Sequence, residues 1–141
     1  MHNDKNIPII INKKYIVETL INSGTFSNVF KVTYDNKYYA IKNEITSNLL
    51  KHEQKIYKEL KNVNNISKII DFFKYKNVTY MVLDYYEDTL ISFKTKHYNS
   101  KDYNIRISKI FSTIIKTISD VHNCGIVHRD LKPNNICLDL N

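Results

Sequence analysis

The stretch IVHRDLKPNNI, residues 126–136, sets a group of polar side chains between two apolar ends. Asp130, Lys132 and Asn135 stand at fixed offsets inside it, and Pro133 follows the lysine. A polar turn containing proline is the simplest interpretation. Such a turn has little use for an acid, a base and an amide in this order between hydrophobic anchors. The arrangement therefore indicates a site of chemistry.

The composition is that of a globular protein. The chain has 141 residues, of which 43% are hydrophobic and 25% are charged, enough for one domain with a modest core. No apolar run approaches the roughly 18 residues of a membrane helix, and the N-terminus lacks the apolar segment of a signal peptide. Cys124 and Cys137 form no CxxC motif and are expected to be reduced. We expect a cytoplasmic or nuclear protein with no membrane partner.

The net charge of +7 is spread over lysines that form no tract. Asn, Ile, Lys and Tyr are abundant, and Ala40 is the only alanine. The codons of these four abundant residue types are A+T-rich, so the composition suggests an A+T-rich genome such as that of a large DNA virus or a protist. We interpret the charge as general surface basicity and expect no specific nucleic-acid partner; a dedicated nucleic-acid face is the alternative.

Hydrophobic periodicity predicts a mixed set of strands and helices. Alternating apolar runs predict strands at 15–21, 28–34, 37–43, 66–73 and 78–86. A helix is predicted over 47–63, with Ser47 as its N-cap. Apolar residues at helical spacing predict a second helix from about 102 to 123, which Gly125 would end in a left-handed conformation.

Two charged residues lie where packing alone favours apolar ones. Ala40 and Lys42 share one face of the third predicted strand, because side chains alternate. A small residue beside a lysine suggests a wall for a flat ligand with a cation at its edge. Glu53 lies on the apolar stripe of the first predicted helix, where a buried carboxylate needs a partner. Lys42 is the candidate; the alternative is that Glu53 reaches solvent at the edge of the stripe.

Three motifs together resemble those of eukaryotic-type protein kinases. HRDLKPNN at 128–135 is similar to the catalytic loop, AIK at 40–42 to the third-strand lysine motif, and INSGTFSNV at 21–29 to the Gly-rich loop. A lysine two residues after Asp130 is the pattern of serine/threonine kinases. The order of the predicted elements also matches.

The resemblance implies an α+β fold. It would comprise a kinase small lobe, with a five-stranded antiparallel sheet plus one helix, followed by the first helix and the catalytic loop of the large lobe. Residues 1–141 would be a partial kinase domain. The small lobe would cover about 15–83, the hinge 84–86 and the start of the large lobe 87–141.

The resemblance also implies roles for individual residues in phosphoryl transfer, with ATP and Mg²⁺ as cofactors. Asp130 would accept the proton of the substrate hydroxyl, Lys132 would neutralise charge on the transferred group, and Asn135 would hold Mg²⁺. Glu53 would hold Lys42 against the nucleotide phosphates. The implied ATP-binding residues are Gly24, Val29, Ala40, Lys42, Glu53, Asp84 and Tyr86.

The chain departs from the family pattern at two places. Asn22 and Ser27 replace glycines of the Gly-rich loop, and residues 131–141 contain no Asp-Phe-Gly. We expect the N-terminal portion of a kinase domain, truncated before that motif and inactive alone. Its partner would be a protein substrate or another kinase, and the helix around 105–121 suggests self-association. The alternative is a non-catalytic kinase homologue that binds nucleotide or acts as a decoy or interaction module.

Overall fold

The computed structural model describes residues 9–25, 27–44 and 48–139. The chain divides into two compact units, one formed by Met1–Tyr57 with Ser67–Tyr85 and the other by Lys58–Ile66 with Tyr86–Asn141. Both strands and helices are present, so the predicted α+β class is confirmed. Ser47, the predicted N-cap, lies outside the described residues.

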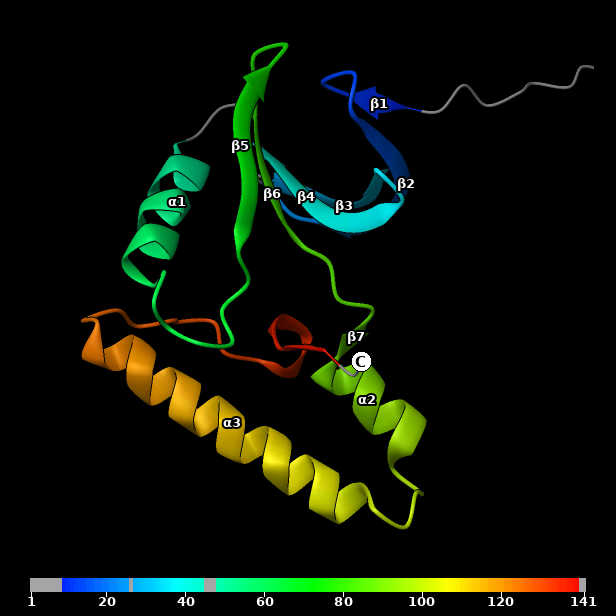
Figure 1. Ribbon diagram of the computed structural model, residues 1–141, viewed down its shortest axis with the longest axis vertical. Helices are drawn as coiled ribbons and strands as arrows, with labels where there is room; N and C mark the ends of the chain where they lie inside the picture. Colours follow the sequence, from blue (N-terminus) through cyan, green and yellow to red (C-terminus); the bar gives the residue numbers. More distant parts are fainter. Residues whose placement is uncertain (1–8, 26, 45–47, 140–141) are drawn as a thin grey trace, which may run out of the picture. The chain divides into compact units, whose positions relative to one another are not determined.

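The first unit is built on a curled antiparallel sheet of six strands (Figure 1). They are β1 (Ile10–Ile11), β2 (Tyr15–Ser23), β3 (Ser27–Tyr34), β4 (Lys37–Glu44), β5 (Ile69–Tyr75) and β6 (Val78–Asp84), in the spatial order β1-β2-β3-β4-β6-β5. The five predicted strands correspond to β2 to β6. β1 is an addition, because two residues are too few to show an alternating pattern.

The tight turns between β3 and β4 and between β5 and β6 contain no glycine. Asp35 and Asn36 have φ angles of 49° and 57°, and Lys76 and Asn77 have φ angles of 47° and 64°. Two consecutive residues with positive φ are the signature of the type I′ turn, whose twist matches that of the flanking strands. Asn and Asp tolerate this conformation better than other non-glycine residues. They supply it here in a chain with only two glycines.

A cluster of buried residues in the first unit lies on one face of the sheet. Tyr15, Val32, Ile41 and Val82 are fully buried there. The cross-strand pairs Val32↔Tyr39 and Ile41↔Val82 keep this face continuous from β3 through β4 to β6. Residues one step along each strand point to the opposite face.

One helix of the first unit begins shortly after β4. α1 (Leu49–Glu59) is shorter at both ends than the predicted helix over 47–63. Past Glu59 the backbone turns more tightly, with Val63 N donating to the Leu60 carbonyl oxygen at 2.9 Å, and Asn65 has a φ of 59°. Asparagine competes for backbone hydrogen bonds and so favours a helix end over helix continuation.

The second unit contains two helices. α3 (Tyr103–Asn123) confirms the predicted long helix, and Gly125 after it has the expected left-handed φ of 73°. α2 (Leu90–His97) was not predicted, because eight residues carry little periodic signal. Its start is marked by a capping box in which Thr89 and Ser92 bond each other's backbone N–H groups.

Two short strands hold the end of the polar stretch. β7 (Asp88–Thr89) pairs antiparallel with β8 (Cys137–Leu138), and Leu90 N donates to the Ile136 carbonyl oxygen at 2.8 Å. The 3₁₀ turn η1 (Pro133–Asn135) lies just before β8. The segment that carries Asp130 is therefore tied to the start of α2.

Candidate functional site

The predicted partner of Glu53 is present. Lys42 Nζ on β4 lies 2.6 Å from Glu53 Oε2 on α1, so the pair is confirmed and the solvent-pointing alternative for Glu53 is wrong. The side chains are 27% and 31% exposed, so this ion pair is half-buried. A pair with this exposure adds little to stability.

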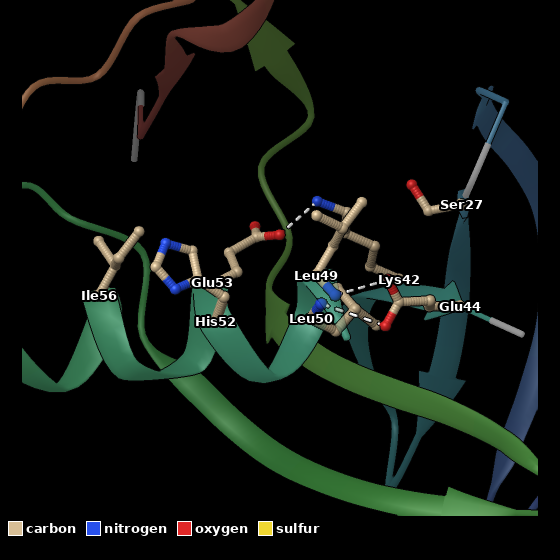
Figure 2. A pocket seen from close by; sticks show the side chains of 8 residues that line it. All are labelled: Ser27, Lys42, Glu44, Leu49, Leu50, His52, Glu53 and Ile56. Carbon is tan, nitrogen blue, oxygen red and sulfur yellow. Dashed lines mark hydrogen bonds and ion pairs between the residues drawn. The ribbon is translucent and has the colours of Figure 1, made fainter. Parts of the chain in front are cut away.

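The pair borders a pocket of about 280 Å³ (Figure 2). Ser27 of β3, Lys42 and Glu44 of β4, and side chains of α1 that include His52 and Glu53 line it. The Lys42 ammonium is paired with the Glu53 carboxylate, which Figure 2 shows directed toward it. Lys42 is the positive side chain of this lining, and Glu44 and Glu53 are its negative ones.

The predicted adenine-covering residues share the sheet face of Lys42. Val29 pairs across the strands with Lys42, and Ala40 lies two residues before Lys42 on β4. Paired residues and residues two apart point to the same side of a sheet. This face is opposite to the one that carries Ile41 and the core. The arrangement agrees with a wall that a flat ligand can approach.

The hairpin around Gly24 is closed by polar contacts. Gly24 N donates to the Ser27 carbonyl oxygen at 2.9 Å, and Ser23 Oγ donates to Asn28 Oδ1 at 2.7 Å. A Cβ at position 24 would lie 3.5 Å from the Ser27 carbonyl oxygen, an ordinary contact. The fold therefore does not require glycine at this position. The bare backbone instead suits the close approach of a ligand.

The hinge residues fall on both sides of the division between the two units. Asp84 ends β6, and its Oδ2 accepts a hydrogen bond from Lys68 N at 3.0 Å. Tyr86 begins the second unit's later segment. The binding of adenine by these two residues stays a prediction.

The polar stretch closes into one cluster. Lys132 Nζ lies 2.9 Å from Asp130 Oδ2, and Asn135 Nδ2 donates to that same oxygen at 2.9 Å and to the Asp130 carbonyl oxygen at 2.8 Å. Asp130 N donates to His128 Nδ1 at 3.2 Å, and Arg129 has a left-handed φ of 65°. The three predicted residues are thus brought together, with the backbone turned sharply beside them.

The charge state of Asp130 follows from these bonds. The Lys132 ammonium first, and the Asn135 amide second, hold the pKa of the Asp130 carboxyl below its usual 3.8. Because this pKa is lowered, the contacts stabilise the loop above about pH 3.8, and that stability is lost as pH falls through the folded-state pKa. An ionised carboxylate of low pKa is a weak base at neutral pH. Asp130 therefore stays ionised at neutral pH and accepts the contacts of Lys132 and Asn135 as a carboxylate.

Replacing Lys132 by alanine is expected to raise the pKa of Asp130 toward 3.8, since the largest cause of the lowering is removed. A carbon-detected NMR titration of the Asp130 carboxyl measures the midpoint. Lys96→Ala, which removes a comparable 2.6 Å ion pair with Asp88, should leave the Asp130 midpoint unchanged. An identical Asp130 midpoint in Lys132→Ala and wild type would contradict the assignment.

The residues near Asn135 offer a partial ligand set for a divalent cation. The Asn135 amide oxygen and the neighbouring Asp130 carboxylate are hard oxygen donors of the kind Mg²⁺ prefers. Within residues 9–25, 27–44 and 48–139, no group of three or more His, Cys, Asp or Glu side chains is placed to hold a metal. Asn135 and Asp130 would hold a Mg²⁺ ion only together with further oxygen ligands, such as nucleotide phosphates and water.

Glu44 is a pocket residue that was not predicted. It is 2% exposed, and its carboxylate oxygens accept hydrogen bonds from the first backbone N–H groups of α1. Its only sequence signal is its position two residues after Lys42, on the same face of β4. A carboxylate at a strand end is usually solvated, so that signal is weak.

Comparison with known proteins gives the family. The model of the protein kinase domain matches residues 15–141, and the chain belongs to this family as the N-terminal portion of such a domain. Among the described residues, no helix is both long enough and apolar enough to cross a membrane.

The relatives are protein kinases by name, and two of the three described here are named as serine/threonine kinases. A Saccharomyces cerevisiae protein described as a probable serine/threonine-protein kinase is 36% identical over 86% of this chain and 37% of its own length. A Caenorhabditis elegans protein named as a serine/threonine-protein kinase is 30% identical over 94% of this chain and 40% of its own length. Calcium-dependent protein kinase 4 of Plasmodium berghei is 29% identical over 96% of this chain and 27% of its own length. The chain therefore spans two fifths or less of these relatives.

Proposed function

We propose that the protein is part of an ATP-dependent kinase that transfers the γ-phosphoryl group of ATP to serine or threonine hydroxyls of protein substrates. The observation that carries this proposal is the Asp130 carboxylate bonded to both Lys132 and Asn135. Phosphoryl transfer needs mainly positioning and charge neutralisation from the protein. This cluster offers a hydroxyl acceptor and a cation within one hydrogen-bonded group.

In the proposed mechanism, Asp130 accepts a hydrogen bond from the substrate hydroxyl and directs its oxygen at the γ-phosphorus. The new O–P bond forms as the bond to the bridging oxygen of ADP breaks, and the hydroxyl proton passes to Asp130. Lys132 neutralises charge on the group in transfer. Mg²⁺, near Asn135, would neutralise phosphate charge when bound.

The nucleotide part of the proposal rests on the first unit. Lys42, oriented by Glu53, would bind the α- and β-phosphates, and the Gly24 amide would approach phosphate closely. Val29 and Ala40 would cover one face of adenine. The Asp84 carbonyl and the Tyr86 amide would recognise its edge. The ion pair and the shared sheet face of Val29, Ala40 and Lys42 support these roles.

Calorimetric titration with Mg-ATP tests the nucleotide site. The 141-residue chain is expected to bind with a Kd of tens of micromolar or weaker, about −6 kcal/mol. Lys42→Met should weaken binding at least about tenfold, because a single charged hydrogen-bonding partner of phosphate is worth about 1.5–3 kcal/mol. Lys14→Met is the matched control, since Lys14 pairs with Asp71 at 3.3 Å and has no proposed ligand. Equal heats from wild type and Lys42→Met, or none from either, would refute the site.

A second candidate is a non-catalytic homologue that binds nucleotide or acts as a decoy for another kinase. It is favoured by Asn22 and Ser27, which stand in place of glycines of the Gly-rich loop. The Ser23–Asn28 bond fixes the hairpin that would have to adapt to phosphates. Nucleotide binding without phosphoryl transfer in any assayed form of the protein would support this candidate.

The partners and location remain part of the proposal. Protein substrates or a partner kinase fit the family, and a cytoplasmic or nuclear location fits the reduced cysteines expected of Cys124 and Cys137. Phe111 and Ile115 of α3 are 50% and 69% exposed, which supports self-association through the 105–121 helix. An A+T-rich genome, viral or protist, remains our interpretation of the composition.

A further inference from the structure

Glu44 connects the end of β4 to the beginning of α1. Its Oε1 accepts a hydrogen bond from Leu49 N at 2.9 Å, and its Oε2 accepts one from Leu50 N at 3.2 Å (Figure 2). The first N–H groups of a helix have no partner inside the helix and carry a partial positive charge. α1 has no acidic residue in its first turn. The carboxylate of Glu44, at the end of the preceding strand, accepts hydrogen bonds from two of these N–H groups. It also places a negative charge beside their partial positive charge.

β4 also holds α1 at the next turn of the helix. Lys42 lies two residues before Glu44 on β4, so both side chains point to the same face. Glu53 lies four residues after Leu49, which places it on the helix face above the first turn. α1 is therefore attached to β4 at two successive turns, first through Glu44 and then through the Lys42–Glu53 pair.

The two attachments differ in strength. The Lys42–Glu53 pair is half-buried, and pairs of this kind hold their geometry weakly. Glu44 is 2% exposed, and a buried carboxylate that loses its hydrogen-bond donors is costly. The firmer attachment thus lies at Glu44 and fixes where the weaker one forms.

We propose that Glu44 is a positioning residue that sets the place of α1 on β4 and thereby holds Glu53 against Lys42. The consequence for nucleotide binding rests on the proposed function, because Lys42 is the proposed phosphate ligand. The positional claim itself concerns only β4 and α1. It is therefore testable without nucleotide.

The test is the acetylation rate of Lys42 by acetic anhydride, measured by mass spectrometry on the 141-residue chain. An ammonium bonded to a carboxylate at 2.6 Å must give up that bond before its nitrogen reacts. Glu44→Ala is expected to raise the acetylation rate of Lys42 at least about threefold. This factor corresponds to the weakest coupling that is usual between residues of one hydrogen-bonded network. Glu44→Gln keeps one acceptor oxygen and should show a smaller rise. In a Glu53→Gln background, Glu44→Ala should add no further rise.

Two controls separate position from unfolding. The Lys14 rate should stay unchanged in each variant, because its pair with Asp71 lies elsewhere in the same unit. Glu18→Gln is the matched variant, since Glu18 is an exposed strand glutamate that accepts one hydrogen bond, from Thr33 at 2.6 Å. It should leave the Lys42 rate unchanged. If Glu44→Ala raises the Lys14 acetylation rate as well, that variant has loosened the whole unit. The Lys42 and Lys14 rates of the milder Glu44→Gln variant then decide between a change of position and unfolding.

An unchanged Lys42 rate in both Glu44 variants would overturn the proposal. An equal rise with and without Glu53 would overturn it too, since Glu44 would then act independently of the pair. In calorimetry, Glu44→Ala should weaken Mg-ATP binding about three- to tenfold, and only when Glu53 is present. If Lys42→Met binds Mg-ATP like wild type, the proposed nucleotide site fails, whereas the acetylation result still decides the role of Glu44.

Discussion

The polypeptide of residues 1–141, purified and supplied with Mg-ATP and a basic serine peptide, is expected to transfer no measurable phosphate. Asn135, the proposed Mg²⁺ ligand, would contribute a single amide oxygen, and the neighbouring Asp130 carboxylate is already paired with Lys132 at 2.9 Å. A hard cation prefers more anionic oxygen ligands. Residues 131–141 contain no Asp-Phe-Gly to supply another carboxylate.

Radiolabel incorporation over hours measures this outcome. We expect a rate at least about a thousandfold below the 1–100 s⁻¹ typical of protein kinases. Asp130→Ala is the control, because it removes the proposed hydroxyl acceptor. Robust phosphorylation by wild type that disappears in Asp130→Ala would show that residues 1–141 suffice for catalysis. Activity that persists in Asp130→Ala would instead identify a contaminating kinase.

Tyr15→Ala is expected to lower the free energy of unfolding of the first unit by about 3–5 kcal/mol, the usual cost of deleting a large buried aromatic side chain. Tyr15 is fully buried. Its ring stacks on Phe73 at a centroid distance of 6.0 Å and meets Tyr34 edge-on at 5.5 Å. Its hydroxyl donates to Asp71 Oδ2 at 3.0 Å. Since domains are stable by only about 5–15 kcal/mol, this loss removes a large part of the total.

Urea denaturation, monitored by circular dichroism, measures the change in the free energy of unfolding. Tyr15→Phe should cost less, about 0.5–1.5 kcal/mol, because it removes one hydrogen bond while Lys14 still pairs with Asp71 at 3.3 Å. Tyr38→Ala is the matched control, because Tyr38 is 55% exposed and should cost less than about 1 kcal/mol. Similar losses of unfolding free energy for Tyr15→Ala and Tyr38→Ala would contradict the assignment of Tyr15 to the core of the first unit.

The longer elements followed from the sequence alone. β2 to β6 and α3 repeat their apolar residues over enough positions to separate a period of two from one of 3.6. The same periodicities place Lys42 on a strand face and Glu53 on a helix stripe. Because a carboxylate among apolar residues needs a positive partner, their pairing was predictable. The spacing of Asp130, Lys132 and Asn135 likewise indicated one site.

The tertiary structure decided what depends on residues far apart in the chain. β1, β7 and β8 each have two residues, so they exist only through their pairing partners, and Thr89 meets Cys137 across such a pair. The sequence indicated that the residues around Asp130 form a site. It did not show that the Asn135 amide donates a hydrogen bond to the Asp130 carboxylate. Glu44 resembles any polar residue at a strand end until the first turn of α1 is placed over it. Periodicity is a local consequence of backbone geometry, whereas a short strand or a buried carboxylate is stabilised by partners that only the folded chain brings near.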